Sequence, residues 1–515
     1  MRAILALSNS LVKNATGPYV SRTGLPAPPS RSLPASQIRS MNSHLVWLIG
    51  YSLAQLALGA WISRRVRTSS DFFVAGRALG PGLLFSTMLA ANVGAGSTVG
   101  ATGLGYRDGL AAMWWVLSAG IGSFVLAFWI GPAIRRTAAA HDLRTVGDYL
   151  EFRYGVGVRS LIAALLLIGS VFILAGQLIA VSWILNVIAG IPKIVGCVAA
   201  GVLITIYFAG GGLLTSAYVN IVQLTVKMVG FAVAIPFALR AAGGWDAVHA
   251  LQPSPDYWNF WQSGESGLVY LAMLGPAFIV SPGLLQKTYG ARDDRAVRLG
   301  VGFNALALMV YAGVPVFLGM MARAQFPDLA QSELALPTLL AKGVPPAVGA
   351  LGLAAVFSAE LSAADAVLFT LTTSLSQDFY KRFYRPAAND AEMLRITRVT
   401  AVFAGALGVG VALVAGGVVS ALSIFYTIMG VSLFVPMIAG LFQPKAKSVD
   451  AMAAIITGIV IVGGWRVALA GKPINGITPA MGGLAGAIMV FLVVYLIRRA
   501  SGGPDRAPPL TPATE

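Results

Sequence analysis

Residues 355–381 read AVFSAELSAADAVLFTLTTSLSQDFYK and place Glu360 and Asp365 well inside a segment otherwise apolar enough to cross a bilayer. A charge at the centre of a membrane helix costs at least ~2.5 kcal/mol, so such groups normally face a cavity, a partner or an ion pathway. At helical spacing Ser358, Ser362 and Asp365 stand at i, i+4 and i+7 on one face. This polar stripe is typical of the wall of a cation site.

The composition is that of a helical membrane protein with many spans. The chain has 515 residues, of which 57% are hydrophobic and 11% charged, whereas a soluble chain needs more charge to cover its surface. The net charge of +16 is distributed over many loops, so we expect a lipid bilayer and no nucleic acid as partner. The single cysteine, Cys197, excludes a disulfide or a thiolate metal cluster within one chain.

The apolar segments predict about thirteen transmembrane helices of roughly 20 residues each. They begin near residues 45, 79, 112, 158, 194, 217, 267, 298, 349, 395, 422, 451 and 479. Lys and Arg gather in the connections that follow odd-numbered helices, which predicts that those connections are cytoplasmic. We therefore expect an integral protein of the bacterial inner (cell) membrane, with the N-terminus outside and the C-terminus in the cytoplasm.

The ends of the chain differ from this apolar body. Residues 1–43 are rich in Ser, Pro and Arg without a sustained helical period, so we expect a poorly ordered segment and a true start at Met41. Residues 44–499 form the expected transporter domain, and residues 500–515 a cytoplasmic tail.

Two predicted spans are interrupted in comparable ways. The second contains AANVGAGS at residues 90–97, and the seventh contains Gly275-Pro276 followed by Ser-Pro-Gly at 281–283. Paired breaks five helices apart indicate an inverted-repeat transporter with its site at the bilayer midplane, here with repeats at 78–240 and 266–442. The alternative is glycine for close helix packing and proline for a simple kink.

With these motifs the chain resembles the sodium/solute symporter family from about residue 45 to 498. The resemblance rests on five motifs in order: DFFVAGRALG at 71–80, AANVGAG at 90–96, GGLL at 211–214 with Asn220 and Gln223, Gln286-Lys287, and residues 358–381. It implies an all-α membrane fold with a LeuT-like core of five plus five helices in inverted repeats.

The resemblance also implies a sodium site between the second and ninth helices. By position, the metal ligands would be the backbone carbonyls of Ala90, Val93 and Ala359 and the hydroxyl of Ser362. The family's commonest motif has two adjacent hydroxyls, and here Ser362 is followed by alanine. We expect Asp365, three residues further on, to compensate through water as part of the sodium site.

Other polar residues in the spans concern the solute and the charge balance. We expect Asn92 and Ser97 at the first break and Gly275 at the second to bind the solute. For Lys227 in the sixth span two arrangements are open: an ion pair with Glu360 or Asp365, or a side chain that extends along its helix to water. Several family members carry an aspartate where this chain has Asn220, which favours one sodium ion per cycle.

The predicted function is sodium-coupled import of a small organic solute across the cytoplasmic membrane by alternating access, with sodium as coupling ion and no further cofactor. The three histidines fall in predicted tails or loops, which argues against a membrane enzyme. Two alternatives stay open: a proton-coupled symporter of the same fold that uses Glu360 or Asp365, and a transporter-like membrane sensor. Family members carry sugars, amino acids, carboxylates and vitamins, so the sequence leaves the solute open.

Overall fold

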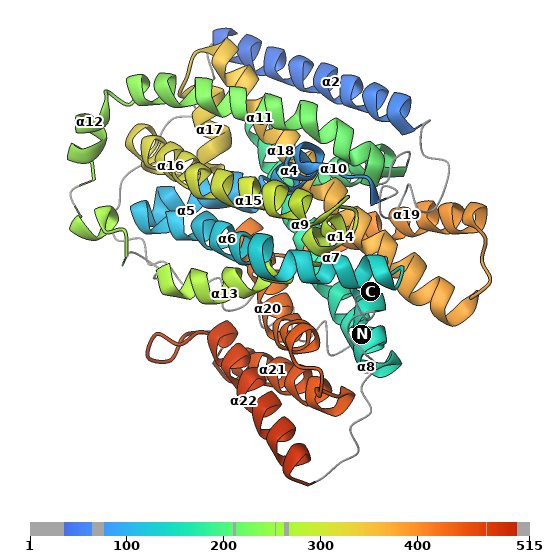
Figure 1. Ribbon diagram of the computed structural model, residues 1–515. Helices are drawn as coiled ribbons and strands as arrows, with labels where there is room; N and C mark the ends of the chain where they lie inside the picture. Colours follow the sequence, from blue (N-terminus) through green and yellow to red (C-terminus); the bar gives the residue numbers. More distant parts are fainter. Residues whose placement is uncertain are drawn as a thin grey trace.

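The protein is described by a computed structural model that covers residues 35–63, 77–209, 213–252, 254–261, 267–469 and 471–501. These residues form a bundle of helices, and none of them forms a β-strand (Figure 1). Residues 1–34 and 502–515, most of the two expected terminal segments, lie outside the described residues. Met41 lies within the first described helix, and the position of the true start stays a prediction.

The helices follow one another with short connections. The first half of the chain forms α2 (Ala35–Ser63), α4 (Pro81–Asn92), a wide turn Gly96–Gly100, α5 (Ala101–Asp108), α6 (Met113–Val125), α7 (Gly131–Ala140), α8 (Val146–Tyr154), α9 (Val156–Ala189), α10 (Lys193–Ala209) and α11 (Leu213–Ala241). The second half forms α12 (Trp245–Ala250), α13 (Gly267–Ile279), α14 (Pro282–Tyr289), α15 (Asp294–Tyr311), α16 (Gly313–Gln325), α17 (Ala335–Lys342), α18 (Pro346–Thr373) with its extension Ser374–Tyr384, α19 (Asp390–Val414), α20 (Val418–Phe442), α21 (Ser448–Leu469) and α22 (Pro479–Ala500).

Within the described residues, 10 helical stretches are long and apolar enough to span a membrane, and two shorter apolar helices, His44–Gly59 and Lys193–Ile206, accompany them. The predicted number of thirteen is therefore not confirmed. One reason is the broken second span: its first half, α4, has 12 residues, whereas its second half continues into the next predicted span as the stretch Gly96–Ala140.

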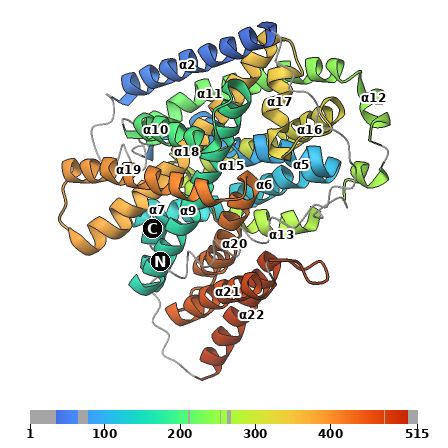
Figure 2. The same ribbon diagram turned by 180° about the vertical axis from the view of Figure 1, so that it is seen from behind.

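The long helix α9 lies at the centre of the bundle and packs against α10, α18, α19 and α20. Helix α11 packs along α18 and also contacts α4. Helices α21 and α22 pair with each other and join the bundle through α20, at the bottom of both views (Figures 1 and 2). The core is therefore made by segments that are far apart in the sequence.

Both predicted interruptions are present, and the second falls at the Ser-Pro-Gly part of its predicted stretch rather than at Gly275-Pro276. The first helix pair is broken between Asn92, the last residue of α4, and Gly96. The second break falls at residues 280–281, between α13 and α14, while Gly275 and Pro276 lie inside α13. Proline in the first turn of α14 needs no backbone N–H partner, so the new helix begins there at little cost.

Glycines allow α5 and α16 to approach closely. A Cβ atom built on Gly319 would lie 2.2 Å from the carbonyl oxygen of Thr102, and one on Gly105 would lie 2.7 Å from the backbone of Val316. Because lipid supplies no hydrophobic drive between helices, such close backbone packing is a main source of their association.

Gly319→Ala should therefore destabilise the protein by about 1–3 kcal/mol, because the methyl group meets backbone that cannot move aside. Gly463→Ala on α21 is the matched control, since nothing lies within 4 Å of its Cβ position. Thermal unfolding of the two purified variants measures the difference. Equal melting temperatures would contradict the packing role of Gly319.

A charged cluster ties α8 to the extension of α18. Glu151 accepts hydrogen bonds from Arg159 and from Arg382, both at 2.6 Å, and Arg159 also pairs with Asp148 at 3.0 Å. Partial burial alone would raise the pKa of the Glu151 carboxyl, but the two guanidinium groups outweigh burial and lower it.

A lowered pKa means that Glu151 stabilises the fold above the unfolded-state pKa, and that this contribution is lost as the pH falls through the folded-state value. Glu151→Gln should lower the free energy of unfolding by about 1 kcal/mol at neutral pH, and the difference from the unchanged protein should vanish in acid. Melting temperatures measured over a pH series check this. Asp142→Asn is the control, because that side chain is 71% exposed and should contribute little.

Candidate functional site

The break after α4 leaves backbone groups in the middle of the bundle, and side chains from other helices satisfy them. The Ala95 N–H donates to Gln177 Oε1 of α9 at 2.9 Å. The Gly94 N–H donates to Ser97 Oγ at 3.1 Å, and Thr98 Oγ1 lies 2.9 Å from the Gly94 carbonyl oxygen. A break at membrane depth is tolerated only with such partners.

Gly94 brings the broken segment against α18. A Cβ atom at this position would lie 2.3 Å from Ala363 Cβ and 3.0 Å from Gln177 Oε1. The small residue that follows Ser362 therefore has a packing reason in this chain. Two small residues facing each other let the α4 break touch the middle of α18.

Next to this contact, three oxygen atoms surround a single cation, the ammonium group of Lys227 from α11. Lys227 Nζ donates to the Ala90 carbonyl at 2.6 Å, to the Val93 carbonyl at 3.1 Å and to Ser362 Oγ. The Ser362 hydroxyl in turn lies 2.7 Å from the Ala90 carbonyl and 3.0 Å from the Ala359 carbonyl. We call this group of Ala90, Val93, Ala359 and Ser362 the cation cage.

The structure thus brings together four of the residues predicted to bind sodium, and places a lysine among them. Neither predicted arrangement of Lys227 is present: the ion pairs among the described residues include none between Lys227 and Glu360 or Asp365, and Lys227 is fully buried rather than extended to water. In the sequence, the signal for this contact was a lysine within an apolar span. In the structure that span, α11, packs on both α4 and α18.

Asp365, the fifth predicted sodium residue, lies in a separate buried cluster. It interacts with the Ser216 hydroxyl and with the charge of Lys287. Lys287 Nζ donates to the Thr87 carbonyl at 3.0 Å, and Asn220 Nδ2 donates to Thr87 Oγ1, also at 3.0 Å. Asp365 therefore lies within electrostatic reach of Lys287, although no ion pair between the two is present among the described residues.

Glu360 is a second buried carboxylate of α18. Its Oε1 atom accepts a 2.7 Å hydrogen bond from Thr98 Oγ1, while Oε2 has no partner in the described residues. Glu360 and Lys287 lie close enough to Lys227 to act on it electrostatically. The centre of the bundle thus holds two lysines and two carboxylates.

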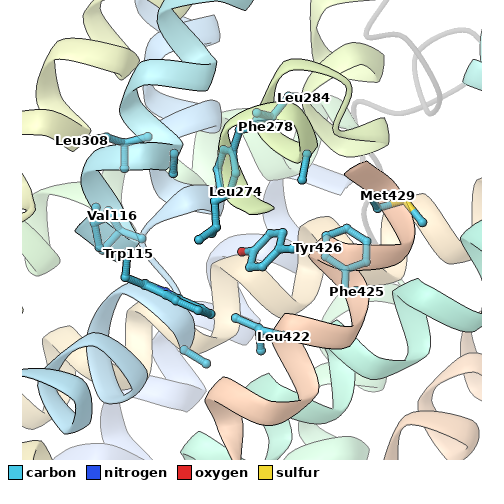
Figure 3. Packing of buried hydrophobic residues seen from close by; sticks show 14 of the residues in the cluster. Trp115, Val116, Leu274, Phe278, Leu284, Leu308, Leu422, Phe425, Tyr426 and Met429 are labelled. Atoms are coloured by element: carbon cyan, nitrogen blue, oxygen red, sulfur yellow. The ribbon is translucent and has the colours of Figure 1, made fainter. Parts of the chain in front are cut away.

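A cavity of about 90 Å³ lies beside the break. Its polar lining includes Asn92, Ser97 and Gln177. Its walls are mainly apolar and aromatic, with Trp115 of α6 facing Tyr426 of α20 (Figure 3). The ring centres of these two residues are 6.0 Å apart.

Of the predicted solute residues, Asn92 and Ser97 line this cavity. Gly275 does not, because it lies inside α13, where its carbonyl oxygen packs against Gly122 of α6. The aromatic residues of the cavity were missed from the sequence. Their only signal was an excess of large side chains on apolar helices, which does not distinguish a cavity wall from ordinary packing.

The cation cage is made of neutral oxygens, the ligand type that suits a hard cation such as sodium. Within the described residues, no group of three or more His, Cys, Asp or Glu side chains gathers as a metal site. Sodium fits the donor set but not the arrangement, because the Lys227 ammonium already binds the Ala90 and Val93 carbonyls and Ser362.

A family model and related sequences indicate the family of the chain. The model of the sodium:solute symporter family matches residues 72–458. The chain is 26% identical to the sodium/pantothenate symporter of Escherichia coli (strain K12) over 440 residues, or 80% of this chain and 88% of the relative. It is 22% identical to the sodium/glucose cotransporter of Vibrio parahaemolyticus, over 78% of this chain and 81% of that one.

Solved structures support the fold. A substrate-bound, outward-open Na⁺-coupled sialic acid symporter superposes with a TM-score of 0.76 at 17% identity, covering 90% of this chain and 99% of the other. A nucleobase-cation-symport-1 family transporter in a closed conformation gives 0.53 at 14% identity, covering 85% and 96%. These likenesses confirm the predicted all-α membrane fold with a LeuT-like core.

The close contact between Gly94 and Ala363 gives a testable pair. Gly94→Ala should destabilise the protein by about 1–3 kcal/mol through overpacking. Adding Ala363→Gly should recover part of this loss, because it removes the Ala363 Cβ atom that the new methyl group would contact. Ala363→Gly alone is the control and should cost about 1 kcal/mol. Thermal unfolding of all three variants completes the cycle; strictly additive losses would mean that the two residues do not touch.

Proposed function

The chain belongs to the sodium:solute symporter family, and on this premise we propose that it imports a small organic solute by alternating access, driven by the downhill movement of a cation. One observation carries the proposal: the cavity lies between the two expected repeats. Its walls come from α4, α6 and α9 of the first repeat and from α13, α18 and α20 of the second. Rocking of one repeat against the other would open such a cavity to either side of the membrane in turn.

The lining indicates the chemistry of the solute. Trp115, Phe278 and Tyr426 offer apolar and aromatic surface, and Asn92 and Ser97 offer hydrogen-bonding groups. We expect a compact solute with an apolar body and one polar end. Lys287 is the charged side chain among the lining residues, which favours a neutral or anionic solute over a cationic one.

Two coupling ions come into question. Sodium is the ion named for the relatives, and the resemblance to the family implies that its ligands are those of the cation cage. A proton is the second candidate, and one observation favours it: the cage is already filled by the Lys227 ammonium. The distribution of Lys and Arg between the loops supports a cell-membrane location with the C-terminus in the cytoplasm.

Uptake into proteoliposomes with independently imposed sodium and proton gradients should show accumulation of at least one solute from a radiolabelled panel of neutral and anionic compounds. Accumulation that collapses when all gradients are dissipated supports symport. Solute binding without uptake under any gradient would contradict transport and favour the sensor alternative.

Tyr426→Phe tests the cavity as the solute site. The hydroxyl of Tyr426 points into the space between Trp115 and Leu274 (Figure 3), so its loss should raise the half-saturating solute concentration about 2- to 10-fold, the effect of one hydrogen bond. Tyr495→Phe on α22 removes the same group outside the cavity and should leave uptake unchanged. Equal behaviour of the two variants would remove Tyr426 from the solute site.

A further inference from the structure

We infer that the ammonium group of Lys227 is the resident cation of the cation cage and takes the place of a sodium ion there. The inference deepens the proposed symport function at the same site, but its first consequence concerns ion binding and needs no transport. The wild-type cage should bind no sodium.

The geometry matches donors to acceptors. A lysine ammonium has three N–H donors, and Lys227 Nζ has three acceptors: two backbone carbonyls, of Ala90 and Val93, and Ser362 Oγ. The Ser362 hydroxyl can pass its own hydrogen on to the Ala359 carbonyl at 3.0 Å. No donor of the lysine is left over to share the cage with water.

The position of α11 delivers this group. A Cβ atom on Gly230, about one turn after Lys227, would lie 2.4 Å from Ala355 Cβ of α18, so α11 and α18 are almost in contact there. At this separation of α11 and α18, the Lys227 side chain extends between them to the broken end of α4. Lys227 is fully buried, so its head group has no route to water that would free the cage.

Sodium and the lysine exclude each other. Both would use the carbonyl oxygens of Ala90 and Val93, and two like charges at one pair of oxygens repel strongly in a buried site. Counted as formal charges, the two buried lysines, Lys227 and Lys287, already match the two buried carboxylates, Glu360 and Asp365. An extra sodium ion would leave this set with an uncompensated positive charge.

The test uses the purified full chain and sodium chloride as the probe, with N-methylglucamine chloride holding the ionic strength constant. Melting temperature and binding of radioactive sodium are followed over a titration to ~100 mM. The wild type should show no saturable sodium effect. Lys227→Met, which keeps most of the length of the side chain and removes its charge, should gain saturable sodium binding within the titrated range.

Two further variants locate the effect. Lys227→Met combined with Ser362→Ala should lose the gained sodium binding, because a cage ligand is missing. Lys287→Met removes the other buried lysine, outside the cage, and any sodium bound beside the uncompensated Asp365 in that variant should be unaffected by Ser362→Ala. If Lys227→Met fails to fold, a comparison of the wild type with Ser362→Ala still tests the inference. Saturable sodium binding by the wild type that Ser362→Ala weakens or abolishes would overturn it.

The two proposals fail in different ways. An absence of solute uptake under every gradient contradicts the symport function and leaves the sodium-binding pattern untouched. Wild-type uptake driven by a sodium gradient and weakened by Ser362→Ala would support symport and overturn the role of Lys227 as resident cation.

Discussion

The interrupted helix after Asn92 is the constraint on which the centre of the protein depends. Backbone groups freed inside a membrane have no water to bind, so each must find a protein partner. Here α9 supplies Gln177 for an N–H group, α11 supplies Lys227 for two carbonyls, and α18 supplies Ser362 beside them. Three distant segments are thereby fixed around one break, and the cavity opens at the point where they meet.

The same break explains the small residues around it. Gly94 faces Ala363, and a Cβ atom on Gly96 would lie 2.4 Å from Leu422 of α20. The contact at Gly94 lets α18 come close enough to place Ser362 against the broken backbone. Close packing and polar satisfaction are therefore two aspects of one arrangement, and a change in either disturbs the other.

The sequence could predict a good part of this site. Ala90, Val93, Ala359 and Ser362 were expected to meet because of the resemblance to the family, and they do. The break in one helix and the polar stripe on another are the local patterns that pointed to the same two segments. Lys227 could not be placed, since its reach depends on how closely α11 packs against α18. Asp365 shares the stripe with Ser362, but Lys287 from the distant α14 decides its surroundings. Trp115 and Tyr426 are indistinguishable from core residues until the helices are placed.

The attachment of Lys227 to its helix has an electrical consequence. A free ion that enters from one side and leaves on the other carries charge through the membrane, and the voltage performs work on it. A charge on a side chain returns to its starting position at the end of each cycle, however far it moves in between. The cage as it stands can therefore respond to voltage within a cycle but carries no steady current of its own.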